Sequence, residues 1–358
     1  FSAPPLVTGD LVIVGSADNT KFWRADNPSG AVRAFDARSG ELRWSFDPIP
    51  RDPDDPAAAD WTPESLARTG GANVWTMMSA DEERGLLFLP TATAGPNNFG
   101  GLRPGDNRYA NSVVALNRAD GSVAWHFQVV HHDVWDLDLP SQPILVELER
   151  DGERIPVVIQ LTKQGLIFVL HRETGEPVFG VEERPVPTDG VPGEVLSPTQ
   201  PFPLKPEPLH PIGISPDDAW GFTVFDRNAC RDKITSMRRG GLYEPPSFEG
   251  SLRSPGASVN NWGGAAWDPQ RQRLVLPISS TPMFLRLTRT DEIPPEVMNQ
   301  PRVGPLGPPM EMAGTPYSYE FAPVMSPIFT PCTAPPWGEL AAIDLTGDTS
   351  TAWRFTLG

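Results

Sequence analysis

A strand–turn–strand unit recurs along the chain and constrains its fold more than any other feature. The segment AVRAFDARSGELRWSF at 31–46 returns as SVVALNRADGSVAWHF at 112–127 and, more loosely, as GLIFVLHRETGEPVFG at 165–180. A fourth copy with a small insertion, GELAAIDLTGDTSTAWRF, covers 338–355. A repeat of this kind is typical of architectures in which similar units pack side by side. We therefore expect each copy to form two paired strands of one structural unit.

The turn of each copy contains residues that favour a tight reversal. Asp36, Asn117 or Asp344 can accept hydrogen bonds from the turning backbone, and a glycine follows where a positive φ angle is needed. These glycines are Gly40, Gly121, Gly175 and Gly347. An aromatic residue then ends the second strand. We expect these aromatic side chains to fill the gaps between neighbouring units; they are Trp44, Trp125, Phe179 and Trp353.

A second pattern supplies further strands. WTMMSADEERGLLFLP at 75–90 and WGGAAWDPQRQRLVLP at 262–277 share a tryptophan, an aspartate, a turn and an apolar strand. Repeated four-stranded units with aromatic plugs are typical of a β-propeller, in which radial closure protects the strand edges. A blade takes roughly 40 to 50 residues. With proline-rich and acidic insertions at 47–72 and 181–220, the chain has room for about five blades.

Composition supports an all-β fold rich in loops. The 43 prolines and 32 glycines interrupt the sequence too often for long helices. We predict one domain over 1–358, about five blades of an eight-bladed propeller, truncated at both ends. The first residues, FSAPPLVTGDLVIVGS, lack the regions of a signal peptide and enter a strand almost at once. We therefore expect a piece of a longer chain, from which any targeting segment could be missing.

Charge and cysteine content limit the partners and the compartment. A formal charge of −16 repels phosphate backbones and argues against nucleic acid as a partner. The sequence has no apolar run of the length that a membrane helix needs. Cys230 and Cys332 are too few for a disulfide scaffold. The sequence leaves two alternatives for this pair: one disulfide bridge in an oxidising compartment, or two buried free thiols.

The segment VVHHDVWDLDLPSQP at 129–143 concentrates ionisable residues between two strands. A zinc site is the first possibility, because histidines are good zinc ligands. However, adjacent histidines on an extended chain point to opposite sides, which weakens a zinc site built on His131 and His132. The three aspartates, Asp133, Asp136 and Asp138, could simply cap turns.

The whole chain gives this segment another interpretation. HHDVWDLDLPSQP, followed by VVIQLTKQGLIFVLHRETGEP at 157–177, resembles the quinoprotein dehydrogenases that use pyrroloquinoline quinone (PQQ). The similarity is to their membrane-bound glucose, quinate and polyol dehydrogenase branch. It runs from end to end, because further motifs occur in the family's order. Among these motifs are VIVGSADN, AFDARSGELRWSFDP, SPTQPF, AWGFTVFD, PPSFEGSL and PWGELAAIDL.

The resemblance implies a catalytic base and a set of cofactor ligands. Asp136 matches the base that takes the proton from the substrate hydroxyl. Lys163 matches the lysine that hydrogen-bonds the quinone oxygens and stabilises the negative charge of the reduced cofactor. Trp75 matches the tryptophan whose face supports the planar cofactor, and Asn261 with Trp262 matches residues that line the same ring.

The resemblance also implies a metal site, and the chain departs from the family's pattern at two positions. Asp18 and Asn19 match the pair that binds the family's metal ion. Their oxygen atoms are hard donors, which suit calcium or magnesium. In the segment TATAGPNN, Gly95 stands where relatives place a hydroxyl or amide side chain near the metal. Pro277 stands where sugar-oxidising relatives have an asparagine. Both departures bear on the identity of the substrate.

The function implied by the resemblance is the PQQ-dependent oxidation of a sugar or polyol hydroxyl. The electrons would pass to ubiquinone in the membrane, from the periplasmic face of the bacterial inner membrane. Parts outside this chain would supply the membrane association. A cofactor-free propeller that acts as an assembly scaffold is the alternative from another class. A third possibility is a protein that keeps the cofactor site but has changed its reaction.

Overall fold

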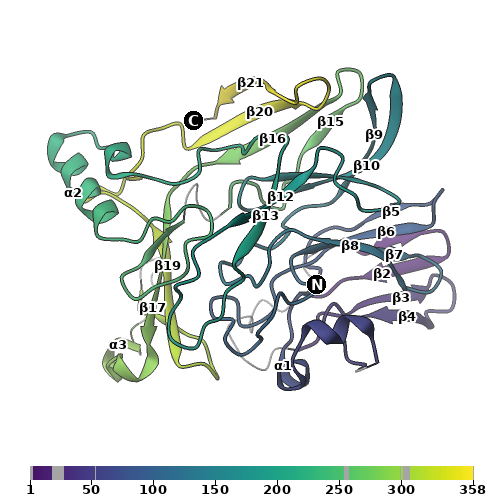
Figure 1. Ribbon diagram of the computed structural model, residues 1–358, viewed down its shortest axis with the longest axis horizontal. Helices are drawn as coiled ribbons and strands as arrows, with labels where there is room; N and C mark the ends of the chain where they lie inside the picture. The colour runs from purple at the N-terminus through teal and green to yellow at the C-terminus, as the bar shows by residue number, and fades with distance from the viewer. Residues whose placement is uncertain are drawn as a thin grey trace.

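The structure, a computed structural model, consists mainly of antiparallel sheets (Figure 1). It describes residues 3–17, 28–52, 54–253, 258–298, 300 and 307–357. The first blade has the strand order β1-β2-β3-β4. Its strands are β1 Leu6–Thr8, β2 Leu11–Val14, β3 Val32–Asp36 and β4 Leu42–Phe46. The second blade has the order β5-β6-β7-β8. Its strands are β5 Ser79–Asp81, β6 Leu86–Pro90, β7 Ser112–Asn117 and β8 Val123–Gln128.

Two further blades follow in the chain. The third blade has three strands, β9 Ile144–Arg150, β10 Glu153–Leu161 and β11 Ile167–His171. Beyond β11 its sheet continues as a bridge between Leu170 and Pro177 and a hydrogen bond of 2.9 Å from the N–H of Val178 to the carbonyl of Val169. Pro177 itself has no N–H to donate to the ladder. The fourth blade has the order β15-β16-β20-β21. Its strands are β15 Ala266–Asp268, β16 Arg273–Ser279, β20 Gly338–Asp344 and β21 Thr351–Thr356.

A further sheet, with four strands, is inserted into the fourth blade, and its order is β14-β17-β19-β18. Its strands are β14 Ser251–Arg253, β17 Met283–Arg289, β18 Met310–Glu311 and β19 Tyr317–Pro323. Three of them lie between β16 and β20 in sequence. A separate hairpin pairs β12 Val181–Pro185 with β13 Thr199–Pro203. The inserted sheet lacks the repeat motif, so the repeat did not predict where it lies.

Three of the four repeat copies form strand–turn–strand pairs as predicted, whereas in the third, at 165–180, the segment after the turn forms no second strand. Trp44 and Trp125 each dock one blade onto the next, but Trp353 of β21 is 40% exposed. Trp44 of β4 donates from Nε1 to the carbonyl of Arg118, 3.0 Å away, and its ring covers Gly121 in the turn of the second blade. A Cβ atom at Gly121 would lie 2.6 Å from this ring, so the turn needs glycine for space as well as for its φ of +74°. Trp125 contacts Gly175 of the third blade in the same way.

The hydrophobic cores lie between neighbouring blades. In β6, Leu87 and Leu89 pack with residues of the first blade, whereas Leu86 and Phe88 pack with residues of the third. Successive side chains of a strand point to opposite faces, so a blade between two others buries both faces. The first strands of the four blades, or residues beside them, also line one cavity of about 560 Å³. We call it the axial cavity. This radial arrangement agrees with the predicted β-propeller.

Helices are short and lie outside the blades. They are η1 Pro56–Asp60, α1 Pro63–Arg68, η2 Pro216–Asp218, α2 Val224–Thr235, η3 Thr290–Glu292 and α3 Pro295–Met298. Within the described ranges, none has both the length and the apolar character to cross a membrane. A disulfide joins Cys230 of α2 to Cys332, and both residues are buried. Of the two alternatives for these cysteines, the structure therefore has the bridge.

Candidate active site

The HHDVWD loop, residues 131–136, has an unusual backbone. His132 and Asp136 have φ angles of +45° and +60°, a left-handed region that residues other than glycine seldom adopt. Asp133 offsets this strain by capping the loop: its carboxylate accepts from the backbone N–H groups of Trp135 and Leu137 at 2.8 and 2.7 Å. It also accepts from Asn111 Nδ2 at 2.8 Å. Asp133 therefore holds the loop in shape, and both of its carboxylate oxygens accept hydrogen bonds from within the protein.

Other side chains anchor the loop to its surroundings. His132 is buried, with Nδ1 2.7 Å from the carbonyl of Gly105 and Nε2 2.8 Å from Glu194. Trp135 is also buried and donates from Nε1 to the carbonyl of Glu244 at 2.7 Å. The ring nitrogens of His131 lie 2.8 Å from Gln128 Oε1 and 3.1 Å from Glu183 Oε1, so both histidines of the motif bond to the protein itself. In the described part of the chain, no three His, Cys, Asp or Glu side chains are close enough to hold a metal ion.

A cavity of about 470 Å³ lies beside this loop, and we call it the site cavity. Its lining residues come from the ends of strands in the first three blades and from the loops that follow them. They are Ser16, Ala17, Pro28, Ser29, Gly30, Gly71, Asn73, Trp75, Ala92, Thr93, Asn97, Asp136, Asp138 and Lys163. Its size lies within the range of small-molecule sites, about 300 to 1,000 Å³.

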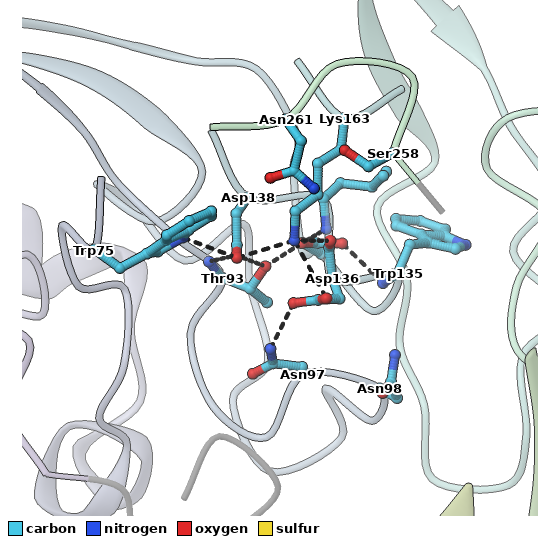
Figure 2. Close-up of polar contacts among 12 residues, drawn as sticks. Trp75, Thr93, Asn97, Asn98, Trp135, Asp136, Asp138, Lys163, Ser258 and Asn261 are labelled. Atoms are coloured by element: carbon cyan, nitrogen blue, oxygen red, sulfur yellow. Dashed lines mark hydrogen bonds and ion pairs between the residues drawn. The ribbon is translucent and has the colours of Figure 1, made fainter. Parts of the chain in front are cut away.

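Lys163, two residues after β10, is the positive charge of the site cavity (Figure 2). Its Nζ donates to the carbonyl of Asp136 at 2.8 Å, to Asp136 Oδ2 at 3.2 Å and to Asp138 Oδ2 at 3.0 Å. Burial opposes its charged form, but the two carboxylates outweigh burial and raise the pKa of Lys163. Lys163 is therefore a permanent cation within the site.

Asp138 is the fixed counter-ion of Lys163. Its carboxylate accepts from Trp75 Nε1 at 3.1 Å, from the backbone N–H of Thr93 at 2.8 Å and from Thr93 Oγ1 at 2.9 Å. Burial opposes its ionisation, but the charge of Lys163 and the hydrogen bonds from Thr93 outweigh burial and lower the pKa of Asp138. Because all these groups donate to the carboxylate, Asp138 stays ionised.

Asp136 differs from Asp138 although both contact Lys163. Its Oδ1 accepts from Asn97 Nδ2 at 2.8 Å, and its side chain keeps 45% of its surface exposed where it lines the cavity. Desolvation of its carboxylate by the surrounding protein raises the pKa of Asp136 to about 6, since the nearby charge of Lys163 opposes this shift only in part and Asp138 adds to it. A carboxyl group with such a pKa can exchange a proton near neutral pH.

The structure brings together three of the residues that the sequence singled out. Trp75, Asp136 and Lys163 all line the site cavity. Asn261 lies beside Lys163 in Figure 2, and the carbonyl of Lys163 accepts from the backbone of Val259 at 2.7 Å. Trp262 is not among the lining residues of the site cavity. It is 68% exposed and lines the axial cavity.

Three other residues have a place that the sequence did not predict. Thr93, Asn97 and Asp138 line the site cavity and bond to its charged groups. Gly95 was expected to leave the segment TATAGPNN without a polar side chain in the site, yet Thr93 and Asn97 on either side of it supply two. Asp18 and Asn19 lie outside the described residues, so the metal site stays a prediction. Ser16 and Ala17, just before them, line the cavity.

Comparison with known proteins identifies the family of this chain. The model of the PQQ family described as "Glucose/ethanol/alcohol dehydrogenase, beta-propeller domain" matches residues 1–358. The chain belongs to this family. Among its relatives is the quinoprotein glucose dehydrogenase of Escherichia coli, 36% identical over all of this chain and 44% of the relative. The quinate/shikimate dehydrogenase (quinone) of Acinetobacter baylyi is 35% identical, again over all of this chain and 44% of the relative.

Two further proteins extend the comparison. One is a relative named for glycerol, and the other has a solved structure. The glycerol dehydrogenase large subunit of Gluconobacter oxydans is 34% identical over 99% of this chain and 49% of the relative. The chain thus spans less than half the length of these three relatives. The quinohemoprotein alcohol dehydrogenase of Comamonas testosteroni has the same fold, with a TM-score of 0.64 at 23% identity over 99% of this chain and 46% of that one.

Proposed function

We propose that the full-length protein oxidises a hydroxyl group of a sugar, polyol or related alcohol with PQQ as cofactor and Asp136 as general base. One observation carries this proposal: two carboxylates contact the same lysine, and one has its pKa lowered while the other has it raised to about 6. A pair whose pKa values diverge in this way separates a charge stabiliser from a proton acceptor. A cofactor-free scaffold gives no reason for this arrangement.

The residues of the site cavity fit a planar, anionic cofactor. Trp75 offers an aromatic face, and its Nε1 is held by Asp138. Lys163 offers an ammonium group that can bond a quinone oxygen. When bound, PQQ would supply the quinone that accepts hydride from the substrate carbon. Asn261, beside Lys163, remains a proposed cofactor contact. Trp262 would have to reach the cofactor from the axial cavity.

Oxygen atoms of the site cavity also fit a hard cation. Asn97 Oδ1 and Ser16 Oγ are buried and have no hydrogen-bond partner among the described residues. A buried oxygen without a partner is costly, and calcium or magnesium binds such oxygens. We propose that Asn97 joins Asp18 and Asn19 around a Ca²⁺ or Mg²⁺ ion. Asn97 would then supply the side chain that Gly95 lacks.

The proton of the substrate hydroxyl would pass to Asp136. Asn97 and Lys163 both donate to this carboxylate, so they fix its orientation and leave its remaining lone pairs for the substrate. Because its pKa is about 6, Asp136 is mostly ionised above that pH and is then ready to accept a proton. Asp138 keeps Lys163 in place and charged throughout the reaction.

We also propose ubiquinone as the electron acceptor and the periplasmic face of the bacterial inner membrane as the location. The name of one relative, quinate/shikimate dehydrogenase (quinone), supports a quinone acceptor. The disulfide between Cys230 and Cys332 suits an oxidising compartment such as the periplasm. The membrane contact would come from parts of the protein outside this chain.

A reconstitution experiment tests the proposed function. The full-length protein is loaded with PQQ and Ca²⁺, and its absorbance spectrum is followed while sugars, polyols and hydroxy acids are added one at a time. We expect the cofactor spectrum to change to that of the reduced form with at least one compound. A protein that binds no PQQ, or whose bound PQQ is reduced by none of these alcohols, would contradict the proposal.

A further inference from the structure

The orientation of Asp136 depends on how two loops fit together. One is the 95–103 loop, which lies between β6 and β7 and carries Asn97, and the other is the HHDVWD loop. Asn97 Nδ2 donates to Asp136 Oδ1 at 2.8 Å (Figure 2). The next residue, Asn98, donates to the carbonyl of Val134 at 3.3 Å. Both hydrogen bonds require the two loops to keep a fixed separation.

Glu194 bonds to both of these loops from a third segment. It lies between β12 and β13, in the proline-rich insertion at 181–220. Its Oε1 is 2.8 Å from Nε2 of His132 in the HHDVWD loop. Its Oε2 accepts from the backbone N–H of Gly100 in the 95–103 loop at 2.7 Å. The Glu194 side chain is 4% exposed. One buried carboxylate therefore holds a different loop with each of its oxygens.

Close packing makes this contact sensitive to small changes. A Cβ atom at Gly100 would lie 2.2 Å from Nε2 of His132, so the 95–103 loop lies directly against the imidazole ring. The other ring nitrogen, Nδ1, is 2.7 Å from the carbonyl of Gly105. Because both ring nitrogens are bonded, His132 cannot turn away from Glu194 without losing a hydrogen bond in a buried place, which is costly.

Arg103 joins the same two loops at a second point. It is 1% exposed, and its Nη2 donates to the carbonyl of Pro96 at 3.1 Å and to the carbonyl of Asp133. Its Nη1 donates to Asn107 Oδ1 at 2.6 Å, which fixes the plane of the guanidinium. Arg103 therefore ties the residue before Asn97 to the HHDVWD backbone.

The turn that carries Glu194 is fixed in turn by the inserted sheet. The backbone N–H of Glu194 donates to the carbonyl of Val191 at 3.0 Å, and the hydroxyl of Tyr317 in β19 donates to the carbonyl of Pro192 at 2.8 Å. Val191, Tyr317 and Phe99 share one hydrophobic core. Since Phe99 belongs to the 95–103 loop, the inserted sheet supports both Glu194 and one of the loops that it holds.

We propose that Glu194 is a positioning residue for the general base: with Arg103, it holds the 95–103 loop against the HHDVWD loop so that Asn97 orients Asp136. This inference rests on the proposed function, because it gives Glu194 an effect on turnover only through Asp136. Glu194 is not among the residues that line the site cavity, so it acts at a distance from substrate and cofactor. The insertion at 181–220 thereby takes part in the reaction although it lies outside the blades.

Turnover of single and double variants tests the inference. The full-length protein is loaded with PQQ and Ca²⁺ and assayed with the alcohol that reduces its cofactor. Glu194→Gln keeps the size of the side chain but leaves it one acceptor oxygen, so one loop is released. We expect kcat per folded molecule to fall roughly ten- to a hundredfold, the effect of misplacing a reacting group, with KM and PQQ affinity nearly unchanged. In an Asp136→Asn background, the same change should cost no further turnover.

Two further variants separate positioning from folding. Gly100→Ala places a methyl group against His132 without changing any charge, and it should lower kcat in the same way. It also carries the test if Glu194→Gln does not fold. Glu183→Gln is the matched control: Glu183 lies in the same insertion and is 3.1 Å from Nε2 of His131, but its side chain is 49% exposed. In the described part of the chain it bonds to only one of the two loops, so kcat should stay the same.

Two results would overturn the inference. One is an unchanged kcat in both Glu194→Gln and Gly100→Ala. The other is an equal loss of turnover from Glu194→Gln with and without Asp136→Asn, which would mean that Glu194 acts on the protein as a whole and not through the base.

Hydrogen exchange followed by mass spectrometry tests the inference without any reaction. In Glu194→Gln, backbone amides of the 95–103 and HHDVWD loops should exchange faster together, while Glu183→Gln should leave exchange in the 95–103 loop unchanged. If wild type oxidises no alcohol, the proposed function fails, but faster exchange in both loops would still support the role of Glu194 in holding them, and unchanged exchange would contradict it. If wild type is active and the variants are equally active, the proposed function stands and the inference fails.

Discussion

Asp136 and Asp138 are two residues apart and share the ammonium group of Lys163, yet their pKa values shift in opposite directions. The difference comes from the remaining hydrogen bonds. Thr93 and Trp75 donate to Asp138, whereas Asp136 opens onto the cavity and receives one bond from Asn97. One carboxylate is therefore fixed in its ionised state, and the other can change its protonation during a reaction.

The proton acceptor can be identified by comparing two aspartates of one loop. Asp136→Asn keeps the shape of the side chain and removes its basicity, so turnover should fall by roughly a hundredfold to ten-thousandfold. Because the pKa of Asp136 is raised to about 6, its ionisation opposes folding above that pH, and the variant should be no less stable than wild type at pH 7. Turnover and thermal unfolding of the full-length protein check both parts.

Asp133→Asn provides the matched control. Asp133 caps the loop backbone, so this variant should lower the melting temperature while turnover per folded molecule falls much less than in Asp136→Asn. Equal losses of turnover at the two positions, or a larger loss at Asp133, would mean that Asp136 is not the base.

Activity should depend on pH through the carboxyl group of Asp136. A base must be ionised to accept a proton, so kcat/KM should rise as the pH passes about 6, the pKa of Asp136. Asp138 contributes to raising that pKa. In Asp138→Asn, the rise should therefore move to lower pH, because Asp136 then has Lys163 to itself. A pH profile of kcat/KM for wild type and Asp138→Asn measures the shift, and a rise at unchanged or higher pH would contradict this coupling.

Metal binding should depend on Asn97 as well as on Asp18. In Asn97→Ala, the buried oxygen without a partner is lost, so calcium affinity measured by calorimetry should fall roughly tenfold or more. Asp18→Ala should abolish PQQ-dependent activity unless calcium is raised greatly. Asn98→Ala is the control, because the Asn98 amide donates to the carbonyl of Val134 and the residue is not among those that line the site cavity. Unchanged calcium affinity in Asn97→Ala would place the metal elsewhere.

The sequence predicted the blades well because their signals are local. Turn residues such as Gly121 and docking residues such as Trp44 act within a few residues or on the adjacent unit. The sequence of a repeat copy is therefore enough to predict its turn and its docking side chain. It did not predict the roles of Thr93 and Asn97, because these depend on how a loop folds back on the HHDVWD segment.

Two tryptophans of similar appearance in the sequence should behave differently when they are removed. Trp44 packs on Gly121 and bonds the carbonyl of Arg118, so Trp44→Ala should open a gap between blades and lower the melting temperature, with PQQ affinity unchanged. Trp75 lines the site cavity, and Trp75→Ala should weaken PQQ binding with a much smaller effect on the stability of the cofactor-free protein. Fluorescence titration with PQQ and thermal unfolding of both full-length variants measure this contrast. A large loss of cofactor-free stability in Trp75→Ala with normal PQQ affinity would show that Trp75 is a structural plug like Trp44.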